Sequence, residues 1–146
     1  MSRVLVVEDA PDLRLLLRLV LQDDGLEVAE AGAGPDALVA MRREPADVIL
    51  LDVQMPSMDG WDVLRAIRAD PRTARLPVVL CTVKGGPSDR VRGWRLGCDG
   101  YLAKPFDIAE VVATVRSVMS TTPDDRAARR ADAIRELEQS HDAVTR

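Results

Sequence analysis

The fold is decided by the segment Val48-Ile49-Leu50-Leu51-Asp52, in which four large apolar residues end abruptly at a carboxylate. A run this short and this apolar, with no polar alternation, is typical of a strand buried on both faces of a parallel sheet. A second run, Arg3-Val4-Leu5-Val6-Val7, lies near the start of the chain and ends at Glu8 and Asp9. We therefore expect two central strands, each followed directly by acidic residues.

Segments of strand length alternate with amphipathic segments along most of the chain. The expected strands cover residues 3–7, 26–31, 48–51, 76–82 and 100–103, and the expected helices cover residues 12–23, 35–43, 61–67, 88–96 and 107–119. In the first helix, for example, Leu13, Leu17, Val20 and Leu21 recur at helical spacing. Asp59 is the expected N-cap of the third helix. This alternation predicts an α/β fold, a doubly wound parallel sheet with helices on both faces.

Composition excludes several classes of protein. The 146 residues suit one domain, and 24 acidic against 20 basic residues give a net charge of −4. That balance, with only 3% aromatic residues, argues against direct nucleic-acid binding. No apolar run is long enough to span a membrane. Cys81 and Cys98 have neither metal-site nor CxxC spacing and are expected to be reduced thiols, so we expect a cytoplasmic protein.

Acidic residues follow both central strands at their carboxyl ends. Because these ends meet at one edge of a parallel sheet, Glu8, Asp9 and Asp52 are expected to converge. Three adjacent carboxylates repel one another unless a cation joins them, and hard oxygen ligands suit Mg²⁺. Taken singly, Asp9 could instead cap the helix that follows Ala10, and Asp52 could be a solvated strand end.

Two further strand ends carry complementary groups. Thr82 brings a hydroxyl to the end of the fourth strand, and Lys104 brings an ammonium to the end of the fifth. A lysine there could neutralise a phosphate beside the metal, although an ordinary strand threonine and a loop lysine are the simpler interpretations. The Lys104–Pro105 bond is a candidate cis peptide.

With these residues in place, the chain resembles the receiver domain of two-component response regulators over residues 3 to about 119. The resemblance rests on Glu8-Asp9, Asp52, the loop Met55-Pro56-Ser57-Met58-Asp59-Gly60, Thr82, Tyr101 and Lys104-Pro105-Phe106. It implies a flavodoxin-like, five-stranded parallel sheet in the order 2-1-3-4-5, with five flanking helices.

The resemblance also implies the chemistry of the site. Asp52 would accept a phosphoryl group from a histidine kinase or a phosphotransfer protein. Asp9, Asp52 and the backbone carbonyl of Gln54 would hold Mg²⁺, with Glu8 acting through metal-bound water, and Lys104 would neutralise the phosphoryl oxygens. Such a domain is no enzyme in the usual sense, because it catalyses only its own phosphorylation and dephosphorylation.

A conformational switch is implied as well. The Thr82 hydroxyl would bond a phosphoryl oxygen, and Tyr101 would turn inward into the vacated space. That movement would remodel the face formed by the fourth helix, fifth strand and fifth helix, where a downstream protein partner would bind. Gln54, Val83 and Lys84 would tune the lifetime of the phosphoryl group. From the residues alone, Tyr101 also fits a half-buried strand aromatic.

Two other classes of protein fit less well. A phosphoaspartate hydrolase of the haloacid dehalogenase type needs an acid two residues after its nucleophile, where this chain has Gln54. A flavodoxin needs a phosphate loop rich in hydroxyls and glycine after the first strand. Here Glu8 and Asp9 would repel a phosphate.

Beyond the receiver, taken as residues 1–119, residues 120–146 form a C-terminal extension or linker. Thr122 as N-cap, followed by Pro123, Asp124 and Asp125, predicts one more helix. Its apolar face is narrow and it carries slightly more acidic than basic charge. It could dock on a partner, or dimerise two copies of a stand-alone receiver. It could also lead into an output domain that this chain lacks, or extend into solvent.

Overall fold

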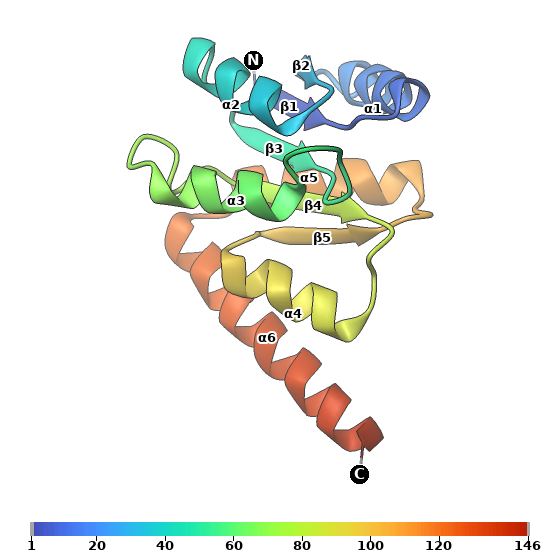
Figure 1. Cartoon of the computed structure of the whole chain (residues 1–146), viewed down its shortest axis with the longest axis vertical. Coiled ribbons are helices and arrows are strands. Elements are labelled where there is room, and N and C mark those ends of the chain that lie inside the picture. Colours follow the sequence, from blue (N-terminus) through green and yellow to red (C-terminus); the bar gives the residue numbers. More distant parts are fainter. Residues whose placement is uncertain (1, 146) are drawn as a thin grey trace.

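Strands and helices alternate along the chain in the computed structural model, which describes residues 2–145, with side chains through residue 140. Five parallel strands form one sheet in the order β2-β1-β3-β4-β5 (Figure 1). The strands are β1 (Arg3–Val7), β2 (Glu27–Ala31), β3 (Val48–Leu51), β4 (Val78–Thr82) and β5 (Gly100–Ala103). The helices are α1 (Pro11–Asp23), α2 (Gly34–Arg43), α3 (Gly60–Ala69), α4 (Pro87–Leu96), α5 (Ile108–Ser120) and α6 (Pro123–Thr145). The predicted fold class and strand order are confirmed.

The central strands β1, β3 and β4 bury both of their faces, as their apolar runs predict, whereas the edge strand β2 is partly exposed. Val4 and Val6 point to the side covered by α1 and α5, where they pack with Leu17 and Val115. Alternate residues of the same strands point to the opposite side, which α2, α3 and α4 cover (Figure 1). Central strands therefore carry no polar face, and their chemistry is confined to their ends.

Strands β2 and β4 begin one and two residues later than expected, because the first expected residue of each strand belongs to the preceding turn. Leu26 donates its N–H to the carbonyl of Leu21 and so belongs to the turn that ends α1. Leu76 likewise donates to Thr73 in the turn after α3. Both side chains are apolar, which is why the sequence pattern extended the strands over them.

Helix α3 begins where the sequence predicts it. The Asp59 carboxylate accepts a hydrogen bond from the N–H of Asp62 at 2.9 Å. Gly60 then packs against the backbone that follows β3, where an added Cβ would lie 2.4 Å from the Asp52 carbonyl oxygen. This close approach requires glycine, and it anchors α3 against the loop that carries Asp52. The Lys104–Pro105 bond is cis, as expected.

An ion-pair cluster that the sequence analysis missed lies at the amino ends of β4 and β5, opposite the carboxyl ends of the strands. Asp99, just before β5, is buried and accepts hydrogen bonds from the N–H of Val78 and from Arg68, each at 2.9 Å. Arg68 also binds the carbonyl oxygens of Leu76 at 2.6 Å and of Gly97 at 2.6 and 3.0 Å. One carboxylate and one guanidinium thus join α3, α4, β4 and β5.

Helix α6 turns back onto the domain. Thr122 caps it by accepting a hydrogen bond from the N–H of Asp125 at 3.1 Å, as predicted. Arg126 is buried and Arg130 pairs with Asp99, so the first turns of α6 pack on the domain and the helix lies along α4. Among the alternatives for this segment, the extension into solvent is wrong for these turns. Within residues 2–145, no helix combines the length and the apolar character needed to cross a bilayer.

The two cysteine thiols are expected to be inert in the folded protein. Cys81 and Cys98 are buried, and burial raises the pKa of Cys81 to about 12 and that of Cys98 above its ordinary range. The reactive thiolate is therefore scarce at pH 8. We predict no reaction with a thiol-specific disulfide reagent until urea unfolds the chain, whereupon both thiols react. Rapid reaction of either thiol in the native protein would contradict this.

Candidate functional site

The parallel sheet brings three acidic residues to one edge. Val7 and Leu51 are paired across β1 and β3, so the residues that follow them emerge side by side. The Asp52 N–H donates to the Val7 carbonyl at 3.0 Å, which extends this register by one step. Glu8, Asp9 and Asp52 each offer a carboxylate oxygen within 4.8 Å of the others. The predicted convergence is confirmed.

A single ammonium group joins the two buried carboxylates. Lys104 Nζ lies 3.0 Å from Glu8 Oε2 and 3.3 Å from Asp52 Oδ2. Glu8 and Asp52 are only 3% and 4% exposed, whereas Asp9 lies at the solvent boundary. Lys104 is positioned by its own N–H, which donates to the Thr82 carbonyl at 2.8 Å and continues the β4–β5 pairing.

Burial and charge act in opposite directions on this group of residues. Burial has the largest effect and raises the pKa of Glu8; the Lys104 hydrogen bond offsets part of this rise, and the nearby Asp52 carboxylate adds a smaller rise. Burial alone would lower the pKa of Lys104, but its contacts with Glu8 and Asp52 outweigh that and raise it. The cluster therefore carries excess negative charge that one lysine does not fully neutralise.

The donor set fits a hard divalent cation. Three carboxylates with oxygens within 4.8 Å of one another can share an ion that prefers oxygen ligands. Asp9, the exposed member, leaves the cluster open to solvent, as Mg²⁺ requires because it retains several waters. The Gln54 N–H donates to Asp52 Oδ1 at 3.2 Å and so fixes the course of the loop that carries the Gln54 carbonyl.

A short hydrogen-bonded path leads away from the carboxylates. Thr82 is fully buried at the end of β4, and its Oγ1 accepts from the Lys84 N–H at 3.3 Å. The Lys84 carbonyl in turn accepts a hydrogen bond from the Tyr101 hydroxyl. Tyr101 makes no hydrogen bond to the acidic residues among the described contacts. The Tyr101 ring already lies inward, 8% exposed, and burial raises its pKa above the ordinary range.

A glycine in α4, which the sequence analysis missed, makes room for this ring. A Cβ added at Gly93 would lie 2.9 Å from both Tyr101 Cε2 and Leu80 Cδ1. Arg90, one turn earlier in α4, stacks over the ring at 5.1 Å from its centroid. A glycine inside an otherwise ordinary helix is the signal that could have indicated a close packing partner.

The remaining predicted residues, Gln54, Val83 and Lys84, lie in the loops that follow β3 and β4. Gln54 and Val83 are exposed, Val83 by 58%, and Lys84 is half-buried. Arg14, which the sequence analysis passed over, donates to the Glu8 carbonyl at 2.8 Å and steadies the loop after β1. An arginine on the first helix carries no distinctive spacing, so only the folded structure identifies it.

Comparisons with known proteins agree with this geometry. Residues 4–116 match the response regulator receiver domain model. The chain is 41% identical over 119 residues to the probable transcriptional regulatory protein TcrX of Mycobacterium tuberculosis, covering 82% of this chain and 50% of that protein. It is 40% identical over 126 residues to the DNA-binding response regulator MtrA of Mycolicibacterium smegmatis, covering 86% of this chain and 54% of MtrA.

A smaller protein of known structure has the same fold. The chemotaxis protein CheY4 of Vibrio cholerae superposes with a TM-score of 0.77 and 33% identity, covering 81% of this chain and 98% of that one. The chain spans about half the length of the curated relatives that it matches. With the receiver sheet, the acidic cluster and the matched residues 4–116 in agreement, the chain belongs to the response regulator receiver family of two-component signalling.

Proposed function

We propose that this chain is a phosphorylation-switched receiver that accepts a phosphoryl group on Asp52 from a histidine kinase or phosphotransfer protein. The observation that supports the proposal most directly is the cluster of Glu8, Asp9 and Asp52 beside the Lys104 ammonium. In this proposal residues 1–119 form the receiver and residues 120–146 form an extension. Acceptance of phosphoryl groups is general for the family.

In the proposed reaction an Asp52 carboxylate oxygen attacks the phosphorus of a phosphohistidine. A new P–O bond forms as the P–N bond breaks, and the departing imidazole keeps the electron pair. Because little covalent assistance is needed, catalysis consists of positioning and charge neutralisation. Asp52 is suited to this role because its backbone is fixed by β3 and its Oδ1 is held by the Gln54 N–H.

A bound Mg²⁺ would neutralise charge on the phosphoryl oxygens and on the carboxylates. Asp9, Asp52 and the Gln54 carbonyl would hold the ion directly, and Glu8 would act through water. The convergence of the three carboxylates, with oxygens within 4.8 Å of one another, supports a shared ion at this place.

Lys104 would neutralise the phosphoryl oxygens from the other side. An ammonium group has three donors, and two of them serve Glu8 and Asp52 in this structure. The third has no partner among the described residues and would bind a phosphoryl oxygen. The carboxylates thus hold the lysine in place before the phosphoryl group arrives, which reduces the reorganisation needed in the reaction.

Thr82 and Tyr101 would convert phosphorylation into a change at the surface. In the proposal the Thr82 hydroxyl bonds a phosphoryl oxygen and so affects Lys84, which links it to Tyr101 by two hydrogen bonds. Tyr101 packs under α4 at Gly93, so its position bears on the face of α4, β5 and α5. Gln54, Val83 and Lys84 would tune access of water to the phosphoryl group.

Output is proposed to pass through a protein partner that binds this face. The mildly acidic chain offers little to a phosphate backbone. MtrA is a DNA-binding response regulator, but this chain spans only about half of it. We therefore propose no direct nucleic-acid contact by the residues present. A receiver fragment of a larger regulator is the alternative that these half-length matches favour.

Replacement of Asp52 by asparagine is expected to abolish phosphorylation. With Mg²⁺ and acetyl phosphate, the wild-type chain should gain the mass of one phosphoryl group, and chelation should prevent the gain, because the reaction needs both a carboxylate oxygen and the ion. Intact-protein mass spectrometry measures both. Thr73→Ala, far from the carboxylates, is the matched control and should still gain the mass. An equal gain in Asp52→Asn would refute the assignment.

Without bound metal, the free energy of unfolding is expected to fall as the pH rises above 4.5, the ordinary pKa of a glutamate. The raised pKa of Glu8 means that the folded state binds a proton that the unfolded state has lost. This contribution to the free energy of unfolding is complete below 4.5 and disappears as pH passes the raised value. Urea denaturation in EDTA between pH 4 and 8 measures it.

Glu8→Gln is the control for this pH dependence, because glutamine cannot titrate. Its free energy of unfolding should lack that slope. Saturating Mg²⁺ should also flatten the wild-type slope, because the ion favours the ionised carboxylates. A slope that persists unchanged in Glu8→Gln would show that another group is responsible.

Gly93→Ala is expected to displace Tyr101 from under α4. Alanine normally stabilises a helix by about 1 kcal/mol relative to glycine. Here the new Cβ would press on the Tyr101 ring and Leu80, so we expect a net loss of roughly 1–3 kcal/mol in the free energy of unfolding. Urea denaturation measures this loss. In a Tyr101→Ala background, which lacks the ring, Gly93→Ala should lower the free energy of unfolding by less than it does in the wild type. An equal loss in both backgrounds would show that the ring is not the obstacle.

A further inference from the structure

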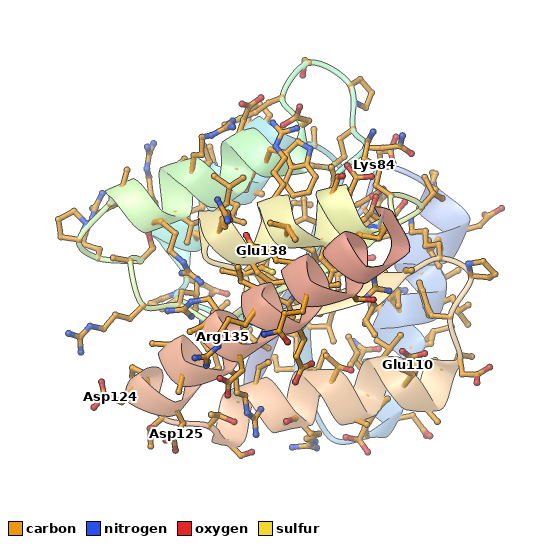
Figure 2. The ribbon with its side chains drawn as sticks, turned by 90° about the horizontal axis from the view of Figure 1, so that it is seen from below. Lys84, Glu110, Asp124, Asp125, Arg135 and Glu138 are labelled. Atoms are coloured by element: carbon orange, nitrogen blue, oxygen red, sulfur yellow. The ribbon has the colours of Figure 1, made fainter. Side chains whose placement is uncertain are left out.

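Helix α6 lies across the surface through which receiver output is proposed to pass. Seen from the β5 edge, α6 runs in front of the sheet between α4 and α5 (Figure 2). It packs along α4 and contacts α5 through Arg129, which donates to Ser117 Oγ at 3.1 Å. Because β5 is an edge strand, α6 lies between this strand and a partner that approaches from the same side (Figure 2).

The hydrogen bonds and ion pairs that hold α6 come from charged side chains, and its apolar residues Ile134 and Leu137 are partly buried. Arg130 pairs with the buried Asp99 carboxylate, and Arg126 Nε lies 3.7 Å from the same carboxylate. Arg126 also donates to the Arg75 carbonyl at 3.0 Å and to the Val118 carbonyl at 3.5 Å. Farther along, Glu138 pairs with Arg95 of α4 (Figure 2).

These contacts concentrate at the start of the helix. Arg126 is buried and Arg130 is partly buried, whereas Arg95 and Glu138 are 61% and 44% exposed. Exposed ion pairs contribute only about 0–1 kcal/mol, so the Arg95–Glu138 pair adds little to the attachment of the later part of α6. The helix projects away from the domain toward its C-terminal end (Figure 1). The buried polar contacts of α6 are therefore those made by Arg126 and Arg130 at Asp99.

The charge in this cluster is not balanced. Arg68, Arg126 and Arg130 surround the single carboxylate of Asp99. Burial lowers the pKa of Arg68, and the neighbouring positive charges of Arg130 and Arg126 add to that effect. Asp99 would keep Arg68 if α6 left, so the domain itself does not depend on the α6 arginines to neutralise its buried carboxylate.

A groove lies beside the docked helix. It has a volume of about 310 Å³ and is lined by Trp94, Asp99, Ala113, Thr114, Ser117, Val118 and Arg129. Arg129 comes from α6 and the other residues come from α4, α5 and the turn before β5. Departure of α6 would remove one wall of the groove and bring Trp94 into wider contact with solvent.

We propose that α6 is a releasable lid, bound in cis to the α4–β5–α5 surface through Arg130 and Arg126 at Asp99. A partner that binds this surface does so by displacing α6. The docking of α6 is argued from the contacts described above, and its role in controlling output rests on the proposed function.

Reversal of one charge tests the lid. Arg130→Glu places a second negative charge at Asp99 and should release α6. Because a free helix of this length and polarity is only marginally stable, hydrogen exchange in residues 124–140 should become several-fold faster. Acrylamide quenching of Trp94 fluorescence should rise, with a Trp94→Phe background identifying the share from the buried Trp61. Exchange in β1 and β3 should match the wild type.

Arg135→Glu is the matched control, because it makes the same charge change in the same helix. Arg135 pairs only with Asp132 of α6 among the described ion pairs and is 67% exposed (Figure 2). It should leave both measurements as in the wild type. The lid is refuted if Arg130→Glu keeps α6 protected while its strands remain folded, or if Arg135→Glu loosens α6 as much.

A second set of variants covers the case in which Arg130→Glu does not fold. Arg95→Glu faces Glu138 with a like charge and should speed exchange at the distal part of α6, and Arg95→Glu/Glu138→Arg should restore the wild-type rate. Absence of any change in the single variant, or of restoration in the double variant, counts against docking on α4. Mass gain with acetyl phosphate, measured on the same proteins, tests the proposed function separately.

Discussion

Like charges forced together at one edge of the sheet are the constraint on which this structure depends. Parallel strands end side by side, so acidic residues that follow β1 and β3 cannot avoid one another. Burial makes their repulsion stronger, and Lys104 offsets only part of it. A site assembled in this way offers oxygen ligands that fit a hard divalent cation.

At the amino ends of the strands, the opposite arrangement of charges occurs. There a single buried carboxylate, Asp99, is surrounded by Arg68, Arg126 and Arg130. The first cluster holds several acids and one base, and the second holds one acid and several bases. In formal charge, neither cluster is neutral by itself.

Strand β5 connects the two charged clusters, because one lies at its amino end and the other at its carboxyl end. Asp99 precedes the strand, Tyr101 lies within it and Lys104 follows it. Tyr101 is linked to Thr82 through Lys84 and packs beneath Gly93 of α4, the helix along which α6 lies. A shift of β5 or of the Tyr101 ring would therefore bear on residues near both ends of the sheet, because β5 contributes to each.

The sequence by itself determined the α/β class, the order of strands and helices, and the acidic residues, Thr82 and Lys104 at the strand ends. These follow from local pattern, because a buried strand must be apolar and its chemistry must lie at its ends. It also indicated the caps at Asp59 and Thr122, whose signals lie within one turn. Only the tertiary structure decided the inward position of Tyr101, the need for Gly93 and the docking of α6 through Asp99. Each of these depends on side chains from distant segments meeting in three dimensions, and neither the spacing nor the composition of the chain encodes which of its many arginines will face a given carboxylate.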